Sequence, residues 1–219
     1  MARRSGGGDL RNEILEVATT LLQRLPLHKL TMEDVARQTG IARQTIYKHF
    51  SGRDELLIAL YIRQIDQNHR PVLERHFADT EPSTRALLDL IMTEIKIASE
   101  FALFDEVLDP NIAPRMAELV FGSVGMAEAR EDYWLPILRR YEESGVLRPG
   151  LDHRAMSRWI TYQQFWLLTH PTALTKEEDE LTAYVRDFMV AAVVTAPLPP
   201  GEIIPTPREK ATGDSIGNL

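Results

Sequence analysis

Apolar residues recur at helical spacing along almost the whole chain, and this periodicity limits the fold more than any other feature. In the first such segment, Ile14, Ala18 and Leu22 lie on one face of a helix. No run of alternating apolar and polar residues indicates a β-strand. The sequence therefore predicts an all-α protein with about nine helices. The predicted helices span roughly residues 9–25, 31–40, 42–50, 53–77, 83–105, 113–122, 126–144, 153–169 and 176–196.

Two of these segments are only about two turns long, and a glycine separates them. Thr31 is followed three residues later by Asp34, which is the spacing of a capping box. Gly40 stands where a helix commonly ends. Ser51 and Asp54 repeat the capping pattern before the next, longer helix. Two short helices joined by a tight turn form a helix-turn-helix, whose second helix can enter the major groove of DNA.

The second short helix, residues 42–50, has an unusual composition. Ile46 and Phe50 lie four residues apart and form its apolar face, so the other side chains are directed outward. Such donors on a narrow rod can reach base edges and phosphates. A plain solvated face is the alternative, but Tyr and His beside Arg and Lys within seven residues favour DNA binding. The outward side chains are Arg43, Gln44, Thr45, Tyr47, Lys48 and His49.

Charge is unevenly distributed along the chain. Residues 1–60 carry a net charge of +2 and the remainder carries −9, which together give the −7 of the 219 residues. This asymmetry is typical of a nucleic-acid-binding module joined to an acidic one. The longest uncharged run, Trp159 to Thr175, contains glutamine, histidine and proline, so no membrane span is expected. Met1 to Gly8 runs into glycines and lacks the apolar stretch of a secretory signal. We expect a cytoplasmic protein.

No grouping of residues indicates an enzyme. The chain has no cysteine, which excludes disulfides, thiolate zinc sites and a thiol nucleophile. It also has no Ser/His/Asp grouping, no glycine-rich phosphate loop and no paired carboxylates in an apolar setting. His69 and His76 are seven residues apart, but no third metal ligand is near them in the sequence. The sequence therefore predicts no catalytic residue, no metal and no cofactor.

The segment from Thr31 to Leu57 resembles the N-terminal region of TetR-family transcriptional regulators. The shared pattern is a Thr that opens the second helix, a Val-Ala pair, glycine and an aliphatic residue in the turn, and Tyr-x-x-Phe at the end of the third helix. The resemblance covers residues 9–57. It implies a helix-turn-helix DNA-binding domain over residues 1–52 and an effector-binding and dimerisation domain over 53–196. The helix 53–77 would bridge both, and residues 197–219, rich in proline, would form a disordered tail.

The resemblance also assigns roles to individual residues. Those that would contact phosphates are Thr31, Tyr47, His49 and Arg53. Those that would face the bases are Arg43, Gln44, Thr45 and Lys48. Two positions depart from the family pattern: Ala42 replaces a frequent Ser or Thr cap, and Pro26 replaces a glycine after the first helix. The missing cap removes roughly 1 kcal/mol of helix stabilisation.

The C-terminal part contains all three tryptophans and most of the other aromatic residues, at helical spacing. In the family this region holds an effector pocket and a dimer interface, the latter here expected in helices 153–169 and 176–196. The alternative for any one aromatic residue is that it belongs to the plain core. The candidate ligand-binding residues are Phe101, Phe104, Phe121, Trp134, Ile137, Tyr141, Tyr162 and Trp166.

Together these observations predict a ligand-responsive repressor that binds palindromic operator DNA as a homodimer. A mostly apolar small molecule, hydrophobic or aromatic, would release it. The alternative is a DNA-binding regulator of the same fold that is controlled by a protein partner or acts without an effector. The expected partners are double-stranded operator DNA, a second copy of the chain and the effector, with no membrane.

Overall fold

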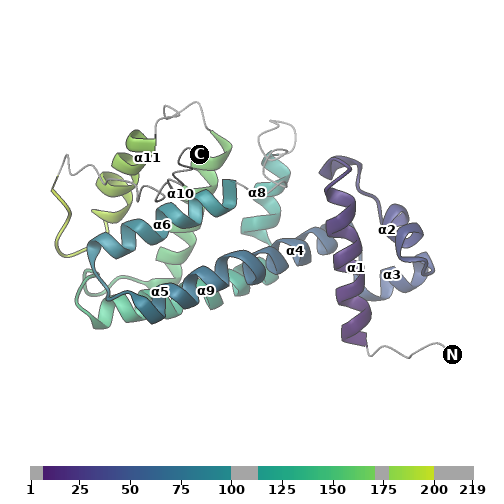
Figure 1. Cartoon of the computed structure of the whole chain (residues 1–219), viewed down its shortest axis with the longest axis horizontal. Helices are drawn as coiled ribbons and strands as arrows, with labels where there is room; N and C mark the ends of the chain where they lie inside the picture. Colours follow the sequence, from purple (N-terminus) through teal and green to yellow (C-terminus); the bar gives the residue numbers. More distant parts are fainter. Residues whose placement is uncertain (1–6, 100–112, 171–177, 200–219) are drawn as a thin grey trace, which may run out of the picture.

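The computed structural model describes residues 7–99, 113–170 and 178–199 of the chain, and the molecule is elongated (Figure 1). Within these residues the only β-type pairing is an isolated antiparallel bridge between Leu147 and Val194. When consecutive α- and π-helical segments are counted together, and one 3₁₀ turn is left aside, the described residues form nine helices. The predicted all-α fold class is confirmed.

Three helices form the N-terminal lobe around a small apolar core. Ile14 and Ala18 of the first helix, Val35 of the second and Ile46 and Phe50 of the third segment are all fully buried. The core therefore consists of the residues that the helical periodicity placed on the inner faces. The bounds are α1 Gly7–Leu22, the 3₁₀ turn η1 Leu27–Lys29, α2 Met32–Thr39 and α3 Arg43–His49.

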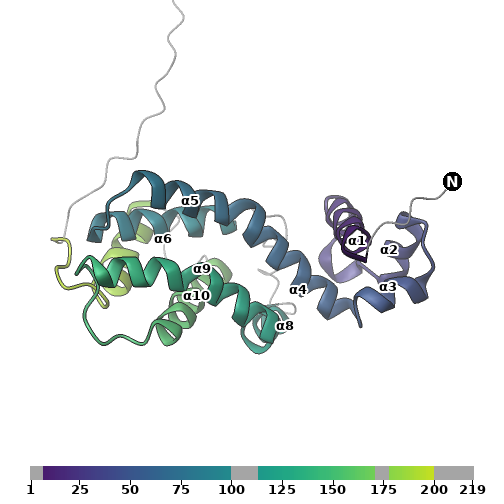
Figure 2. The same ribbon diagram turned by 90° about the horizontal axis from the view of Figure 1, so that it is seen from below.

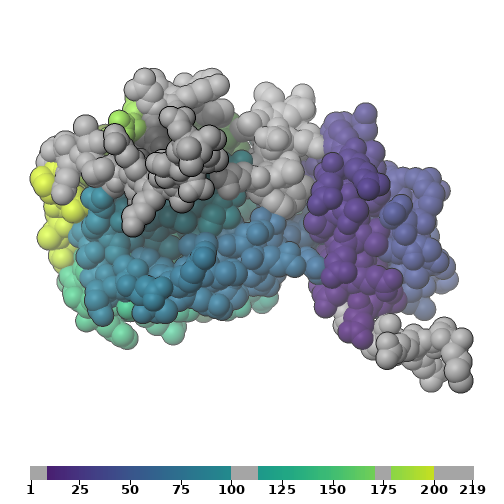
Figure 3. Space-filling model, in the orientation of Figure 1, coloured from purple at the N-terminus to yellow at the C-terminus, as the bar shows by residue number. Residues whose placement is uncertain are grey.

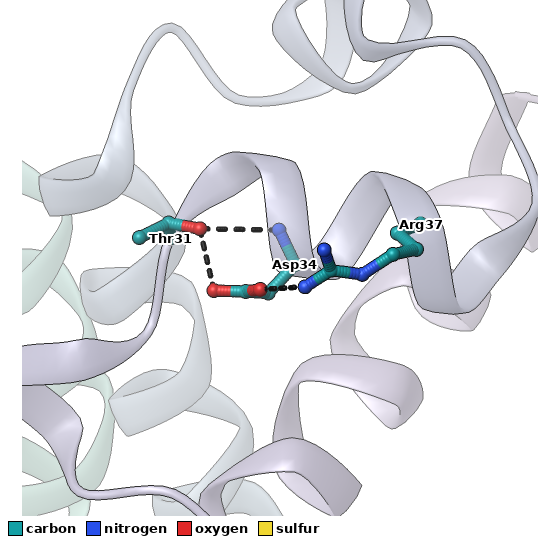
Figure 4. Close-up of polar contacts among 3 residues, drawn as sticks. All are labelled: Thr31, Asp34 and Arg37. Atoms are coloured by element: carbon teal, nitrogen blue, oxygen red, sulfur yellow. Dashed lines mark hydrogen bonds and ion pairs between the residues drawn. The ribbon is translucent and has the colours of Figure 1, made fainter.

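The ends of α2 and α3 follow from local chemistry. The Thr31 side chain caps α2 by accepting from the backbone N–H of Asp34, whose carboxylate also bonds Arg37 (Figure 4). Gly40 ends α2 with a φ of 72°, in the left-handed region that glycine adopts without a steric penalty. Ala42 precedes α3 with no side-chain cap, as its replacement of Ser or Thr predicts.

A long rod leads away from this lobe. It consists of α4 Arg53–Gln64, the π-helical segment η2 Ile65–His69 and α5 Arg70–Asp79. The sequence predicted a single α-helix over 53–77. The structure differs because Pro71 has no N–H, and its ring would clash with the carbonyl four residues earlier in a regular α-helix. A wider turn just before the proline lets the rod continue.

Where the structure describes them, the remaining helices follow the predicted segments with two differences. The helix predicted at 126–144 begins at Val124, because Ser123 caps it and Gly125 is accommodated in its first turn. The helix predicted at 176–196 ends at Val190, after which the chain forms the Leu147–Val194 bridge. Residues 100–105 of the helix predicted at 83–105 lie outside the described residues, as do residues 200–219 of the predicted tail. The bounds are α6 Thr84–Ser99, α8 Ala113–Gly122, α9 Val124–Glu143, α10 His153–Thr169, α11 Glu178–Tyr184 and the π-helical η3 Val185–Val190.

The rod joins the two parts of the molecule. Its first half, α4, packs with the N-terminal lobe and with α8 and the start of α9 in one apolar cluster. Its second half, α5, runs beside α6, and with α9, α10 and η3 these helices enclose a second cluster around Leu87, Ile137 and Tyr141 (Figure 2). The N-terminal lobe lies at one end of the molecule, with α2 and α3 on the side of α1 that faces away from the C-terminal helices (Figures 1 and 3). No described helix is both long and apolar enough to cross a bilayer.

Candidate nucleic-acid interface and interior cavity

The outward face of α3 is formed by four polar side chains. Arg43, Gln44, Tyr47 and Lys48 are exposed, and they recur at one helical turn (43 with 47, 44 with 48). Thr45 and His49 are half-buried, since they lie closer to the Ile46 side of the helix. The structure therefore brings four of the six predicted outward residues onto one exposed face and sets the other two at its edge.

Arg43 and Tyr47 contact each other on this face. Nη2 of Arg43 lies 3.3 Å from the Tyr47 hydroxyl, and its guanidinium carbon lies 5.4 Å from the centre of the Tyr47 ring. A guanidinium over an aromatic face is attracted by the ring quadrupole.

The hydroxyl of Thr31 forms hydrogen bonds with the first turn of α2. The oxygen accepts from the Asp34 N–H at 3.1 Å, and the hydroxyl donates to Oδ2 of Asp34 at 2.5 Å. These hydrogen bonds and the nearby Arg37 lower the pKa of Asp34. The predicted phosphate contact by Thr31 would require its hydroxyl hydrogen to leave Asp34.

Arg53, the first residue of α4, is half-buried against the η1 turn. Its Nε donates to the carbonyl oxygen of Leu30 at 3.0 Å and its Nη2 to that of Leu27 at 2.6 Å. Next to it, Asp54 forms an ion pair with Arg115 of α8. The first turn of α4 is thus bonded to the segment before α2 on one side and to a C-terminal helix on the other. The sequence predicted Arg53 only as a phosphate ligand.

A cavity of about 130 Å³ lies between the rod and the C-terminal helices. Its wall combines residues of α4, η2, α6, α8, α9 and α10. Most of the exposed wall is apolar. The lining residues are Tyr61, Gln64, Ile65, His69, Glu94, Ala98, Val120, Met126, Arg130, Tyr133, Trp134, Thr161, Gln164, Phe165 and Leu168.

Three of the polar lining residues form one hydrogen-bonded group. Nδ1 of His69 lies 2.5 Å from Oε2 of Glu94, and the hydroxyl of Tyr133 donates to Oε1 of the same carboxylate at 2.5 Å. Glu94 is only 4% exposed, so its charge is stabilised by these two donors. Burial, and then the neighbouring Glu94, raise the pKa of Tyr133, which keeps its hydroxyl protonated as the donor.

Arg130 is the other charged residue of the wall, and it has no partner of its own. It is 9% exposed, and its Nε is buried without a hydrogen-bond partner among the described residues. The adjacent carboxylate of Glu131 pairs instead with Arg154, at 3.1 Å. Burial lowers the pKa of Arg130; the charge of Glu131 opposes this shift, and the charge of Arg158 adds to it. An arginine nevertheless stays protonated in a protein.

The predicted ligand-binding residues occupy different places. Trp134 lines the cavity, whereas Ile137 and Tyr141 are fully buried in the second apolar cluster and are not part of the wall. Phe121 and Tyr162 contact each other with ring centres 4.6 Å apart, and neither lines the cavity. Trp166 stacks on His170 and Tyr184, also away from the wall. Phe101 and Phe104 lie outside the described residues.

Sequence reasoning missed the charged residues of the wall, although two of them carry a signal. Glu94 is three residues after Ile91 and seven after Leu87, which places a carboxylate on the apolar face of α6. Arg130 lies four residues from both Met126 and Trp134, on the apolar face of α9. A charged residue at a buried helical position indicates either a hidden partner or a ligand. In the described parts of the chain, no cluster of three or more His, Asp or Glu side chains is placed to hold a metal ion.

Comparisons with known proteins agree with this architecture. Residues 14–60 match the family model described as bacterial regulatory proteins, tetR family. The regulator EthR of Mycobacterium tuberculosis is 34% identical over 64 residues, which are 29% of this chain and 30% of EthR. The chain thus spans about 30% of the length of that curated relative. The repressor KstR2 of the same organism is 24% identical over 155 residues, or 68% of this chain and 75% of KstR2.

The fold also matches a solved structure. The TetR-family repressor AlkX from Dietzia sp. strain DQ12-45-1b superposes with a TM-score of 0.62 at 18% sequence identity. The match covers 88% of this chain and 97% of AlkX. At that identity the likeness establishes a common fold, which includes both the N-terminal lobe and the C-terminal helices.

Proposed function

The chain belongs to the TetR family of bacterial regulatory proteins, and from that premise we propose that it is a ligand-responsive transcriptional repressor. In this proposal it binds palindromic operator DNA as a homodimer, and a mostly apolar small molecule releases it. The relatives are transcriptional regulators, and we propose no catalytic activity for this chain.

The exposed face of α3 supports the DNA-binding step. It presents guanidinium, amide, phenol and ammonium groups, which are the donors that suit base edges and phosphates. The lobe that carries α3 lies at the end of the molecule, so a duplex can approach without meeting the C-terminal helices (Figure 3). In our proposal Arg43, Gln44 and Lys48 face the bases, with Thr45 beside them. Thr31, Tyr47, His49 and Arg53 remain the proposed phosphate contacts.

The last two helices support a dimer. In the segment 176–196, where the sequence predicts part of the interface, Val185, Met189 and Val193 are buried within the subunit, but Phe188 is 65% exposed. Phe188 continues an aromatic row that runs from Trp166 through Tyr184, with ring centres 6.4 and 5.3 Å apart. An aromatic row that ends in an exposed phenylalanine is the kind of surface that a second subunit buries. A two-fold dimer would place two α3 helices about 34–36 Å apart, as palindromic half-sites require.

The main support for a response to a ligand is that residues of the rod form part of the cavity wall. Tyr61, Gln64, Ile65 and His69 come from α4 and η2, and all four line the cavity. The same rod begins at Arg53, which is hydrogen-bonded to the segment before α2. Twelve residues of helix, or roughly 18 Å, separate Arg53 from Ile65. A ligand in the cavity therefore contacts the element that holds the DNA-binding lobe.

The proposed mechanism is a shift of the rod. A ligand changes DNA affinity only by its differential affinity for the two conformations of the protein. If the rod moves as one body, the lobe bonded to its first turn moves with it, and the spacing of the paired α3 helices changes. A coupling of roughly 1–3 kcal/mol between effector and operator is typical of such systems. By linkage, operator DNA must weaken effector binding by the same factor.

The alternative, a regulator controlled by a protein partner or by no effector, would fit a core without a cavity. The cavity between α4, α6, α9 and α10 favours the small-molecule proposal. Equal affinity for a small molecule with and without operator DNA would favour the alternative.

Two measurements test the proposal. Selection of bound sequences from a random duplex library should enrich a palindrome, and no enrichment would contradict operator binding. Apolar compounds that quench tryptophan fluorescence are then titrated with and without saturating operator. All three tryptophans lie between residues 134 and 166, so quenching reports on the C-terminal helices. Weaker binding in the presence of operator is expected; equal affinities would leave the alternative regulator.

A further inference from the structure

The cavity wall contains a buried cation that forms no ion pair with the described residues. Arg130 is 9% exposed, and its Nε has no hydrogen-bond partner among the described residues. An unpaired charge or donor in an apolar site destabilises the protein, because the group loses its water without a replacement. A protein can keep such a destabilising group when a bound ligand supplies the missing hydrogen-bond partner.

The other charged residues at the cavity indicate whether that ligand is an anion or a cation. Glu94 is the one carboxylate among the lining residues, and each of its oxygens already accepts from His69 or Tyr133. The Glu94 carboxylate thus already has a hydrogen-bond partner on each oxygen. Arg130 forms no ion pair among the described residues, because the adjacent carboxylate of Glu131 pairs with Arg154. The unsatisfied group at the cavity is therefore positive, and its complement is an anion.

The rest of the wall indicates the size and polarity of the ligand. Its side chains are mainly apolar, among them Ile65, Val120, Met126, Trp134 and Phe165. The volume of about 130 Å³ is close to that of a cavity known to hold benzene, about 150 Å³. A compact apolar body fits this space, because most of the exposed wall is apolar.

We propose that the cavity binds a compact organic acid, whose carboxylate pairs with Arg130 and whose apolar body packs against Trp134 and Phe165. This inference names the chemical class of the effector and so rests on the proposed function. A guanidinium presents two parallel N–H donors, which match the two oxygens of a carboxylate.

The first experiment compares ligands of one shape and three charges on the full chain. The probes are phenylacetate and octanoate, their neutral amides, and the cationic amines phenethylamine and octylamine. Affinity is measured by calorimetry and by tryptophan fluorescence, because Trp134 lines the cavity. The carboxylates are expected to bind about tenfold or more tightly than the amides, and the amines most weakly.

The second experiment changes the cation. Arg130→Met keeps the length and removes the charge, so the carboxylate should lose about tenfold in affinity while the amide should not. Arg130→Lys should keep part of the preference. Arg139→Met is the matched control, because Arg139 is an exposed arginine of the same helix outside the cavity wall. The control should bind all probes as the unaltered chain does.

Thermal unfolding supplies a readout that does not depend on affinity alone. Without ligand, Arg130→Met should unfold at a higher temperature than the unaltered chain, because it buries no unpaired charge. Octanoate at one fixed concentration should raise the unfolding temperature of the unaltered chain more than that of Arg130→Met. If Arg130→Met does not fold, Arg130→Lys and the ligand series still decide the matter.

The outcomes separate this inference from the proposed function. Carboxylates that bind no better than the amides, or no binding by any probe, overturn the inference. Amides that bind tightly and release operator DNA would overturn it while the proposed function stands. Carboxylates that bind through Arg130 but leave operator affinity unchanged would support the inference and contradict the repressor proposal.

Discussion

Arg53 donates to the carbonyl oxygen of Leu30, 23 residues earlier in the chain, from Nε at 3.0 Å. With its second bond, from Nη2 to Leu27, it ties the start of the rod to the turn that precedes α2. The helix-turn-helix is thus attached to α4 by a charged side chain as well as by the chain itself. In the mechanism that we propose, this contact would pass a shift of α4 to α2 and α3.

Replacement of Arg53 should therefore destabilise the protein. Arg53→Ala removes two charge-assisted hydrogen bonds, to the carbonyl oxygens of Leu30 and Leu27, at a cost of about 1–3 kcal/mol in the free energy of unfolding. Arg53→Lys should restore only part of the lost stability. Its ammonium group cannot donate to both carbonyls in the geometry of the planar guanidinium. Urea denaturation measures both effects. Unchanged stability in Arg53→Ala, together with weaker DNA binding, would instead indicate a phosphate ligand only.

Substitutions on α3 should separate base contacts from phosphate contacts. Lys48→Ala should weaken binding to the selected operator by about 1–3 kcal/mol and relax its sequence preference. Tyr47→Phe should weaken binding to all duplexes about equally, since a phosphate contact carries no sequence information. Competition assays on operator and scrambled duplexes distinguish the two. Lys96→Ala, an exposed lysine of α6, is the control; normal operator binding by Lys48→Ala would show that α3 does not read the bases.

Tyr133→Phe tests the buried group at the cavity. The substitution removes the donor to Oε1 of Glu94 and leaves a buried carboxylate with one bond fewer. We expect the free energy of unfolding to fall by about 1–3 kcal/mol. Tyr162→Phe serves as the control. It should leave stability unchanged, because Tyr162 is 56% exposed. Equal stability of the two variants would mean that water replaces the tyrosine hydroxyl.

His76 should make stability depend on pH. Nε2 of His76 lies 2.7 Å from the Tyr141 hydroxyl, and burial, followed by the charge of Arg140, lowers the pKa of His76 below its ordinary 6.5. The unfolded chain then binds the proton more readily than the folded one. The contribution of His76 to stability is complete above pH 6.5 and is lost as the pH falls through the lowered folded-state pKa.

The variant His76→Gln should reduce this dependence. Between about pH 7 and pH 5, the unaltered chain should lose more free energy of unfolding than His76→Gln does. Urea denaturation at several pH values measures the difference between the two curves. Parallel curves would show that His76 has the same pKa in the folded and unfolded chains.

Phe188→Asp should dissociate the proposed dimer without unfolding the subunit. Phe188 is 65% exposed, so its replacement costs little within one chain, but a carboxylate in a buried interface would be unpaired. Sedimentation at micromolar concentration should give a dimer for the unaltered chain and a monomer for the variant. Val124→Asp changes another exposed apolar residue, 73% exposed at the start of α9, and should remain dimeric. A dimeric Phe188→Asp would place the interface elsewhere.

The local features of the fold were predictable from the sequence because they depend on residues close together in the chain. Helical periodicity selected the inner faces, so Ile14, Ile46 and Phe50 are buried as predicted. Thr31 and Gly40 fixed the ends of α2 through contacts within three or four residues. The π-helical turn was missed because the helical pattern continues through Pro71, and only the missing N–H and the ring geometry interrupt it. The helix predicted to begin at residue 126 begins at Val124 instead, because the cap at Ser123 outweighs the low helix propensity of Gly125.

The sequence by itself determined which segments are helices, which faces are apolar and where the polar face of α3 lies. Only the tertiary structure decided what the charged residues inside the protein contact. Glu94 meets His69 and Tyr133 from 25 and 39 residues away in the chain, and Arg53 meets Leu30 from 23. Such contacts depend on how whole helices pack, and no periodicity records which helix faces which. The unpaired Arg130 is a result of the same packing, because a cation lacks a partner only once its neighbours are fixed.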